Sequence, residues 1–419
     1  MKKIIFLFLV VFSFFSCEKE KGDDPQRHAG RTMLAFFWAD NSLSSNLRNN
    51  IQTMMEGLQA VKTSATLLVY WDGSSSDSNW PMPCIIEYVA DGKGGINGLS
   101  KETLDGMMNT TSVDELINIG TIKKQYESQT STEKTVMKTV IADMMDAYPS
   151  DSYGIIFGSH GSGWLPTISG RSIGQDGGRY SSNTALIPEL AEVLHEVNPM
   201  KFDFVLFDAC MMGCAEVYYE LKDAARYIVA SVLDIPAAGF PYATVMPFLY
   251  ESDIEGSLKT VCKHYIDYYD YNGWGTISLV DCGQMEPLAQ VTRQVLLSNQ
   301  DNLANVNTDD LQQYGRTGVS FKGISYDMVQ FVESLCGGNV PEEFMQQFDK
   351  TVLYKGYTPH VASSIYRIDE EHYCGMGMYI PNSLTSSKYL LWNNYFKSSI
   401  TWYSVSGWAE TEAIWGAEE

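Results

Sequence analysis

A histidine and a cysteine stand in two short segments whose composition suits catalysis. His160 lies within the glycine-rich residues 158–164 (GSHGSGW), and Cys210 lies within residues 208–213 (DACMMG). A cysteine thiolate attacks carbonyl carbon, and an imidazole takes up and returns protons near neutral pH. If the two side chains meet in the folded chain, the pair predicts nucleophilic catalysis.

The backbone around both residues suits the same chemistry. The glycines beside His160 allow a sharp turn and a close approach of substrate to backbone N–H groups. We expect the N–H groups of Gly161 and Cys210 to form an oxyanion hole. A helix is expected from about Gly213 to Lys222, and its dipole would favour the Cys210 thiolate. A lone cysteine at a strand end is most often a small buried apolar side chain, so the prediction depends on the pair.

The elements that must position these residues alternate between strands and helices. Continuous apolar runs predict strands buried on both faces, and an apolar stripe with helical spacing predicts a helix over residues 136–148. Strand 153–157 leads into the His160 segment, and strand 202–207 leads into the Cys210 segment. Because the carboxyl ends of parallel strands share one edge of a sheet, both side chains are expected at that edge. Further strands are expected at 32–38, 65–71 and 227–230, an edge strand at 83–89, and helices ending near Leu58 and spanning 183–197.

This alternation predicts an α/β fold class, with a mostly parallel sheet, helices on both faces and a C-terminal α/β extension. Residues 31–254 are expected to form the catalytic domain, and residues 255–419 a C-terminal region packed on it. The pattern is looser in this second region. Its expected strands are 276–280 and 375–380, and its expected helices are 255–270, 284–298 and 326–335.

Other kinds of site are less well supported by residue spacing. Cys210 and Cys214 with His160 could suggest zinc, but the usual C-x-x-C spacing is absent and no fourth ligand is evident, so no metal site is assigned. Ser162 lacks the G-x-S-x-G turn of serine hydrolases, and residues 375–377 lack the third glycine of a dinucleotide site. Five more cysteines could pair in an oxidising compartment, although buried free thiols are the default expectation: Cys84, Cys262, Cys282, Cys336 and Cys374.

The N-terminus predicts export and a lipid anchor. Residues 1–16 have a short basic start and then an apolar run, which is typical of a secretory signal peptide too short to span a bilayer as a mature helix. The segment ends like a bacterial lipoprotein signal, although Phe14 stands where leucine is usual. This resemblance implies a lipidated Cys17, with residues 17–30 as the lipidated cysteine and a flexible tether. We therefore expect the protein in the cell envelope, anchored in the outer membrane and facing the periplasm or the surface.

Composition narrows the range of partners. The chain has 419 residues, is 45% apolar and carries a formal net charge of −22. The apolar content excludes a disordered chain. A surface this acidic argues against nucleic acid as a partner and is compatible with basic peptides.

The two catalytic segments together resemble the clostripain family of cysteine peptidases, which shares its caspase-like fold with caspases, gingipains and legumains. An alanine–cysteine pair with a histidine about 50 residues upstream is also the caspase pattern. The resemblance extends over most of the chain. The supporting segments are residues 32–58, 187–191, 228–231, 239–242 and 375–381.

The resemblance implies a Cys–His dyad endopeptidase that cleaves peptide bonds after arginine or lysine. Cys210 would attack the scissile carbonyl, and His160 would protonate the leaving amine. Asp208 matches the family position at the base of the primary specificity pocket, where a carboxylate can bind a guanidinium through two hydrogen bonds. The alternative for Asp208 is a helix N-cap. Family members often cleave themselves after a basic residue in the loop behind the histidine, so Arg171 and Arg179 are either self-cleavage sites or ordinary surface residues.

The chain departs from the family pattern at residues 232–238, where family members often carry a glutamate, so the fine shape of the specificity pocket is the least determined feature. Some clostripain-like enzymes use calcium, but no EF-hand loop is present, so no calcium site is assigned and no cofactor is required. The alternative function is a catalytically silent cell-surface protein of the same fold that binds peptides or glycans.

Overall fold

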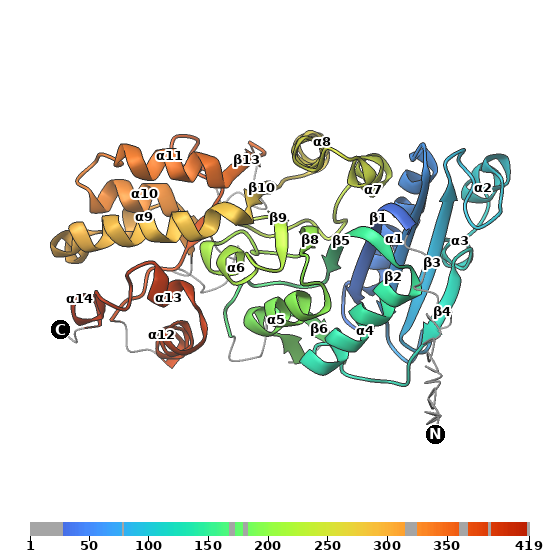
Figure 1. The fold of residues 1–419 in the computed structure, drawn as a ribbon, viewed down its shortest axis with the longest axis horizontal. Coiled ribbons are helices and arrows are strands. Elements are labelled where there is room, and N and C mark those ends of the chain that lie inside the picture. The colour runs from blue at the N-terminus through green and yellow to red at the C-terminus, as the bar shows by residue number, and fades with distance from the viewer. Residues whose placement is uncertain are drawn as a thin grey trace, which may run out of the picture.

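One large sheet runs through the centre of the molecule (Figure 1). The computed structural model describes residues 28–77, 79–166, 172–178, 183–314, 325–359, 368–383 and 387–416. Within these residues the sheet has nine strands. In order across the sheet they are β13 (Val352–Tyr357), β10 (Thr276–Asp281), β9 (Ala225–Ala230), β8 (Phe202–Asp208), β5 (Ser150–Gly158), β1 (His28–Trp38), β2 (Ser64–Asp72), β3 (Cys84–Asp91) and β4 (Thr121–Gln125).

The central strands of this sheet are parallel. β9, β8, β5, β1 and β2 pair in parallel, whereas β10 and β13 on one side and β3 and β4 on the other pair antiparallel. This arrangement confirms the predicted α/β fold with a mostly parallel sheet. The strand predicted at residues 83–89 is confirmed as β3, but its predicted place at the edge of the sheet is wrong, because β4 pairs outside it. β4 is exposed along its whole length and has no apolar run that would have marked it in the sequence.

Helices cover both faces of the sheet (Figure 1). Alternate side chains of β1 enter two separate cores: Met33 and Phe37 pack with α1, α7 and α8, whereas Leu34 and Phe36 pack with α4, α5, α6 and α9. This alternation is the reason why β1 reads as a continuous apolar run. The helices are α1 (Ser44–Ala60), α2 (Lys101–Met108), α3 (Val113–Ile117), α4 (Lys134–Ala147), α5 (Ile187–Val197), α6 (Ala215–Glu220), α7 (Tyr242–Val245), α8 (Ile254–Asn272), α9 (Met285–Ser298), α10 (Met328–Leu335), α11 (Glu342–Thr351), α12 (Ser387–Ser399), α13 (Trp402–Val405) and α14 (Glu412–Trp415).

Three element boundaries differ from those expected. The helix predicted over 183–197 begins only at Ile187, with a proline in its first turn, and the residues before it form β7 (Asn183–Ala185), which pairs with β6 (Ile173–Asp176). Proline fixes a backbone angle suited to the first turn of a helix, which explains this start. Of the strand predicted at 375–380, only β14 (Gly377–Met378) pairs, in a small sheet with β11 (Gln313–Tyr314) and β12 (Ser325–Asp327). The helix expected from about Gly213 is α6, which begins at Ala215.

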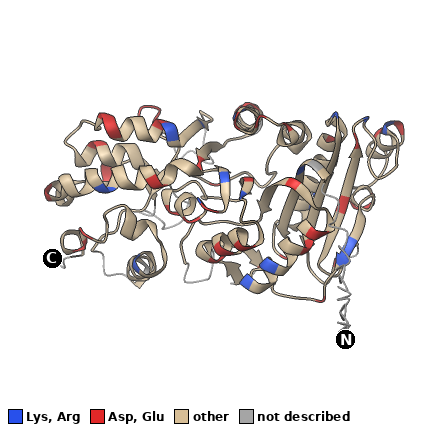
Figure 2. Cartoon of the chain, in the orientation of Figure 1, with Lys and Arg blue, Asp and Glu red and all other residues tan. Residues whose placement is uncertain are grey.

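Acidic side chains are spread over helices from both halves of the chain, with basic side chains scattered among them (Figure 2). Among the described residues, no helix is both long enough and apolar enough to cross a bilayer.

Candidate active site

The strands that precede His160 and Cys210 are direct neighbours in the sheet. β5 and β8 pair in parallel, with Gly158 opposite Asp208, so both chains leave the sheet at the same edge. The backbone N–H of Ser159 still donates to the carbonyl of Asp208 at 3.4 Å. His160 and Cys210 follow directly, are both partly exposed, and line the same cavity of about 250 Å³. The His160 and Cys210 segments therefore meet in the folded chain, as predicted.

This cavity, which we call the active-site cavity, is assembled from segments far apart in the sequence. One wall is the beginning of α1, and the opposite wall is the segment that follows β9. The ends of β5 and β8 form the part between these walls. The residues that line it are Leu43, Asn46, Leu47, Asn50, Ser159, His160, Asp208, Ala209, Cys210, Asp234, Ile235, Pro236, Ala237 and Trp274.

The loop that carries Cys210 is fixed by backbone hydrogen bonds to the segment after β9. The N–H of Met211 donates to the carbonyl of Leu233 at 2.9 Å. Met211 has a φ of 60°, which is a strained value for a residue other than glycine. The N–H of Ile235 lies 3.4 Å from the Cys210 sulfur. An N–H that donates to sulfur favours the thiolate over the thiol. This contact does part of what the sequence assigned to a helix dipole.

The dipole itself is not at Cys210. Because α6 begins at Ala215, its N-cap is Cys214 and Cys210 lies outside its first turn. A helix dipole acts over the first turn only, so the predicted contribution to the Cys210 thiolate is wrong. Cys214 is buried, and burial raises its pKa well above the ordinary thiol value, so this second cysteine stays protonated.

His160 is held from two sides. Its Nε2 lies 2.9 Å from the hydroxyl oxygen of Ser42, just before α1, and its carbonyl accepts the N–H of Gly174 in β6 at 2.9 Å. The amide of Asn41 donates to the Ser159 hydroxyl at 3.2 Å and to the Gln175 carbonyl at 2.8 Å. The backbone of His160 is therefore held by β6, and its imidazole by the segment before α1, which is far from it in sequence.

Ser42 gives a first testable prediction. Its hydroxyl contacts the imidazole and is not part of the cavity lining, so we expect Ser42→Ala to lower kcat by about two- to tenfold and to leave KM nearly unchanged. Ser42→Thr keeps a hydroxyl and should recover most of kcat. Steady-state kinetics on one peptide substrate checks this, with the exposed α1 residue Ser45→Ala as the matched control. A rise in KM without a fall in kcat would contradict the positioning role.

The backbones of Gly161 and Cys210, the two residues predicted to form an oxyanion hole, approach each other closely. A Cβ atom added to Gly161 would lie 2.5 Å from the Cys210 carbonyl oxygen and 3.1 Å from the Cys210 nitrogen. These distances are too short for any side chain, so glycine is required there. The close approach also places the backbones of the two predicted N–H donors, Gly161 and Cys210, side by side.

Asp208 lies at the floor of the active-site cavity and caps no helix. Its carboxylate accepts hydrogen bonds from the Asn50 amide at 3.1 Å and from the Tyr242 hydroxyl at 2.8 Å. Burial raises the pKa of Asp208 to about 6, and the hydrogen bonds from Tyr242 and from the backbone of Phe240 oppose this rise. A Cβ on Gly239 would lie 2.4 Å from the carboxylate, so only a glycine can cover the floor at this point.

Asp234 is a cavity residue that sequence reasoning missed. It is partly exposed and lines the active-site cavity one residue before Ile235, whose N–H reaches the Cys210 sulfur. It lies within residues 232–238, where the sequence departs from the family pattern. The signal that could have found it was a carboxylate in the segment that follows β9 (Ala225–Ala230), the strand next to β8.

Three predicted residues lie outside the described part of the chain. These are Cys17, Arg171 and Arg179. Between the two arginines, β6 is described, and its Gly174 N–H is the one that donates to the His160 carbonyl. The seven cysteines in the described residues are free thiols.

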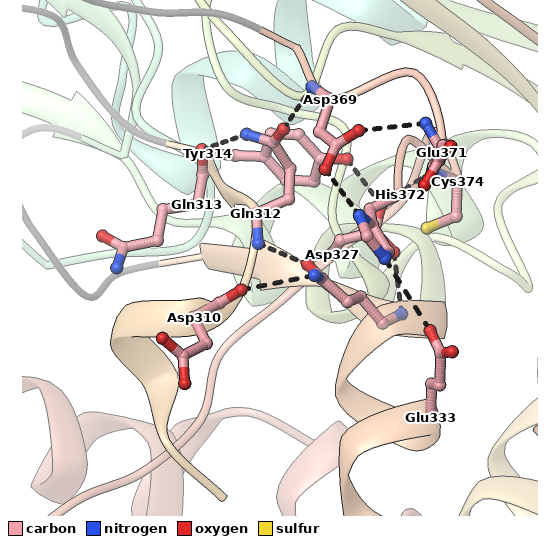
Figure 3. Close-up of polar contacts among 11 residues, drawn as sticks. Asp310, Gln312, Gln313, Tyr314, Asp327, Glu333, Asp369, Glu371, His372 and Cys374 are labelled. Atoms are coloured by element: carbon pink, nitrogen blue, oxygen red, sulfur yellow. Dashed lines mark hydrogen bonds and ion pairs between the residues drawn. The ribbon is translucent and has the colours of Figure 1, made fainter. Parts of the chain in front are cut away.

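A polar network joins β11, β12, α10 and residues 369–374 (Figure 3). The buried Asp327 accepts hydrogen bonds from the Tyr314 hydroxyl at 2.6 Å and from the Cys374 N–H at 2.7 Å. Next to Cys374, His372 bonds to Asp369 at 2.6 Å, and this contact raises the His372 pKa. The network holds Tyr314 and Tyr373, whose rings pack with Val232, Leu233 and Ile368 in a small apolar cluster.

With this geometry established, comparison with known proteins shows what kind of enzyme the site belongs to. The model of the clostripain family (Peptidase C11) matches residues 35–415, which is most of the chain and includes both catalytic segments. The chain belongs to the clostripain family of cysteine peptidases. Membership confirms the resemblance first seen in the His160 and Cys210 segments and makes the protein a hydrolase. The family match does not assign a role to any single residue of the active-site cavity, so these roles stay predictions.

Solved clostripain-family structures share the fold over nearly their whole length. One is an X-ray structure of a secreted C11 cysteine protease from Bacteroides thetaiotaomicron in complex with an irreversible peptide inhibitor. Its sequence is 27% identical to this chain, and the TM-score is 0.71. The match covers 91% of this chain and 100% of that protein. An inactive zymogen C11 protease from Parabacteroides distasonis is 26% identical, with a TM-score of 0.70 and coverage of 91% and 99%. No curated protein matches the chain.

Proposed function

We propose that this clostripain-family peptidase cleaves peptide bonds after arginine or lysine, with Cys210 as the nucleophile and His160 as the proton donor. The observation that carries the proposal is the position of Asp208 at the floor of the cavity lined by both residues. If the residue before the scissile bond places its side chain in this cavity, that side chain meets the buried carboxylate of Asp208.

The charge of the active-site cavity supports a cationic side chain. Asp208 and Asp234 both line it, and the lining includes no lysine or arginine among the described residues. With a pKa of about 6, Asp208 is mostly ionised at neutral pH in spite of its burial. A buried carboxylate without a cationic partner is costly, and a guanidinium or ammonium group would remove this cost on binding. A neutral or acidic side chain would leave it in place.

The proposed reaction uses groups of the chain itself. The Cys210 sulfur attacks the carbonyl carbon, while the N–H groups of Gly161 and Cys210 stabilise the oxygen anion that forms. The proton that the Cys210 thiol loses is held by His160, which gives it to the departing nitrogen as the C–N bond breaks, and a thioester remains on Cys210. Water then attacks the thioester, which releases the acid product and returns the thiol.

Maturation and membrane anchoring are part of the same proposal. Cleavage after Arg171 or Arg179 would fall on either side of β6, which contacts the His160 loop, so it would change the surroundings of the imidazole directly. A relative described as an inactive zymogen supports such a step. Lipidation of Cys17 would hold the enzyme on the outer membrane, where protein and peptide substrates are met. Because β1 already begins at His28, the tether would be shorter than the expected residues 17–30 and would end before this strand. The relatives described as secreted support export.

Matched fluorogenic peptides that end in arginine, lysine, aspartate or leucine test the proposal, before and after limited trypsin nicking. We expect the arginine or lysine peptides to be cleaved, with a gain after nicking if maturation is required. Preference for aspartate or leucine would leave the nucleophile in place and contradict the role of Asp208. Full activity of a chain that runs unbroken on a denaturing gel would contradict maturation.

A further inference from the structure

The active-site cavity contains an indole that neither the dyad nor the carboxylates explain. Trp274 lines the cavity together with Cys210, Asp208 and Asp234. It comes from the short connection between α8 and β10 and is partly buried. An aromatic side chain therefore lines the same cavity as the carboxylates that would bind the substrate cation.

The backbone on both sides of Trp274 is fixed. Before it, the N–H of Gly273 donates to the Tyr269 carbonyl at 3.0 Å and ends α8. After it, Gly275 exchanges two hydrogen bonds with Thr358, each 2.9 Å long. A Cβ on Gly275 would lie 2.7 Å from the Tyr265 ring, so this connection has little room to shift. The backbone that carries the indole is therefore held in place before substrate arrives.

The ring itself also has a support. Trp274 packs against the apolar cluster of Val232, Leu233, Tyr314, Ile368 and Tyr373, which the polar network of Figure 3 holds in place. Trp274 therefore lies between the apolar cluster and the active-site cavity and forms a rigid wall of the cavity. The indole and the two carboxylates line one cavity, so this cavity has both aromatic and acidic surface.

We propose that Trp274 makes this peptidase prefer arginine over lysine at the residue before the scissile bond. The inference rests on the proposed function, because it concerns the same cavity. A guanidinium is planar and weakly hydrated, so it stacks on an indole while its edge donates to a carboxylate. An ammonium is compact and strongly hydrated, and gains less from an aromatic wall. The aromatic surface therefore adds a binding contribution that arginine receives and lysine largely lacks.

The test compares kcat/KM for two peptides that differ only in arginine or lysine at the cleaved position. For the wild type we expect arginine to be favoured by about five- to tenfold. Trp274→Leu keeps apolar surface but removes the aromatic face, so the arginine-to-lysine ratio should fall to about one. Trp274→Phe keeps an aromatic face and should retain most of the preference. Tyr271→Ala, a neighbouring aromatic residue that is 92% exposed, serves as the matched control and should keep the wild-type ratio.

A second measurement does not depend on turnover. Agmatine and cadaverine, a guanidine and an amine of similar length, should inhibit competitively, with agmatine stronger in the wild type and the two equal in Trp274→Leu. Equal cleavage of both peptides by the wild type, or an equal loss on both in Trp274→Leu, would overturn the role of Trp274 and leave the proposed function standing. Failure of the wild type to cleave either peptide would instead refute the proposed function itself.

Discussion

Replacing Cys210 with alanine is expected to lower kcat/KM toward arginine peptides by about 10⁴-fold or more, because no other group in the active-site cavity can form the thioester. The fold should survive. The loop around Cys210 is held by backbone bonds, from Met211 to Leu233 at 2.9 Å and from Gly213 to Ser231 at 2.8 Å, and alanine keeps both. Thermal unfolding should therefore differ little from that of the wild type.

A second cysteine provides the control for this experiment. Cys336 is also a partly exposed free thiol, but it ends α10 and does not line the cavity. Cys336→Ala should keep full activity and should still be labelled by an arginine-directed chloromethyl ketone, whereas Cys210→Ala should not be labelled. Residual activity of more than a few per cent in Cys210→Ala, or an equal loss in Cys336→Ala, would show that the nucleophile lies elsewhere.

Asp208→Asn is expected to lower kcat/KM for arginine and lysine peptides by about 10²- to 10³-fold, with little effect on a leucine peptide. Asparagine keeps an oxygen that can accept from Asn50 and Tyr242, so these two contacts are kept while the negative charge is lost. Kinetics on the matched peptides separates loss of charge recognition from general damage. Asp105→Asn, an exposed carboxylate on α2 paired with Lys101, is the control and should change nothing.

Asp208→Asn lowers activity but is expected to raise the stability of the fold. The size of this gain depends on pH. Burial raises the pKa of Asp208 from 3.8 to about 6 in the folded chain, so the fold holds the proton more tightly than the unfolded chain does. Stability from this group is fully present below pH 4 and is lost as pH rises to about 6. The loss is on the order of 3 kcal/mol, because one pKa unit corresponds to about 1.4 kcal/mol.

Asp208→Asn removes this titration. Relative to the wild type, the variant should gain stability between pH 4 and pH 6 and hold the gain above pH 6, which denaturant unfolding at several pH values can measure. A stability difference that does not change with pH would contradict the raised pKa. A variant that is both more stable at neutral pH and unable to use arginine peptides would show that the carboxylate is retained for recognition at a cost in stability.

Which side chains carry the chemistry could be read from the sequence, because local composition marks them. A histidine among glycines and a cysteine at the end of an apolar strand, each after a run that predicts a buried strand, place both residues at one edge of a parallel sheet. The paired β5 and β8 confirm this placement. The residues that complete the site were not predictable in this way. Ser42, Asn50 and Trp274 sit in segments with no chemical signature of their own.

By itself the sequence determined the α/β fold, the two segments that meet, and the family, because hydrophobic periodicity and glycine-rich turns are local properties of the chain. The tertiary structure alone decided what surrounds them. It replaced the expected helix dipole with the Ile235 N–H, brought Asp234 to the cavity, and buried Asp208 enough to raise its pKa to about 6. Desolvation, hydrogen bonding to sulfur and the walls of a cavity depend on atoms from distant segments, and no local pattern encodes which of those atoms will meet.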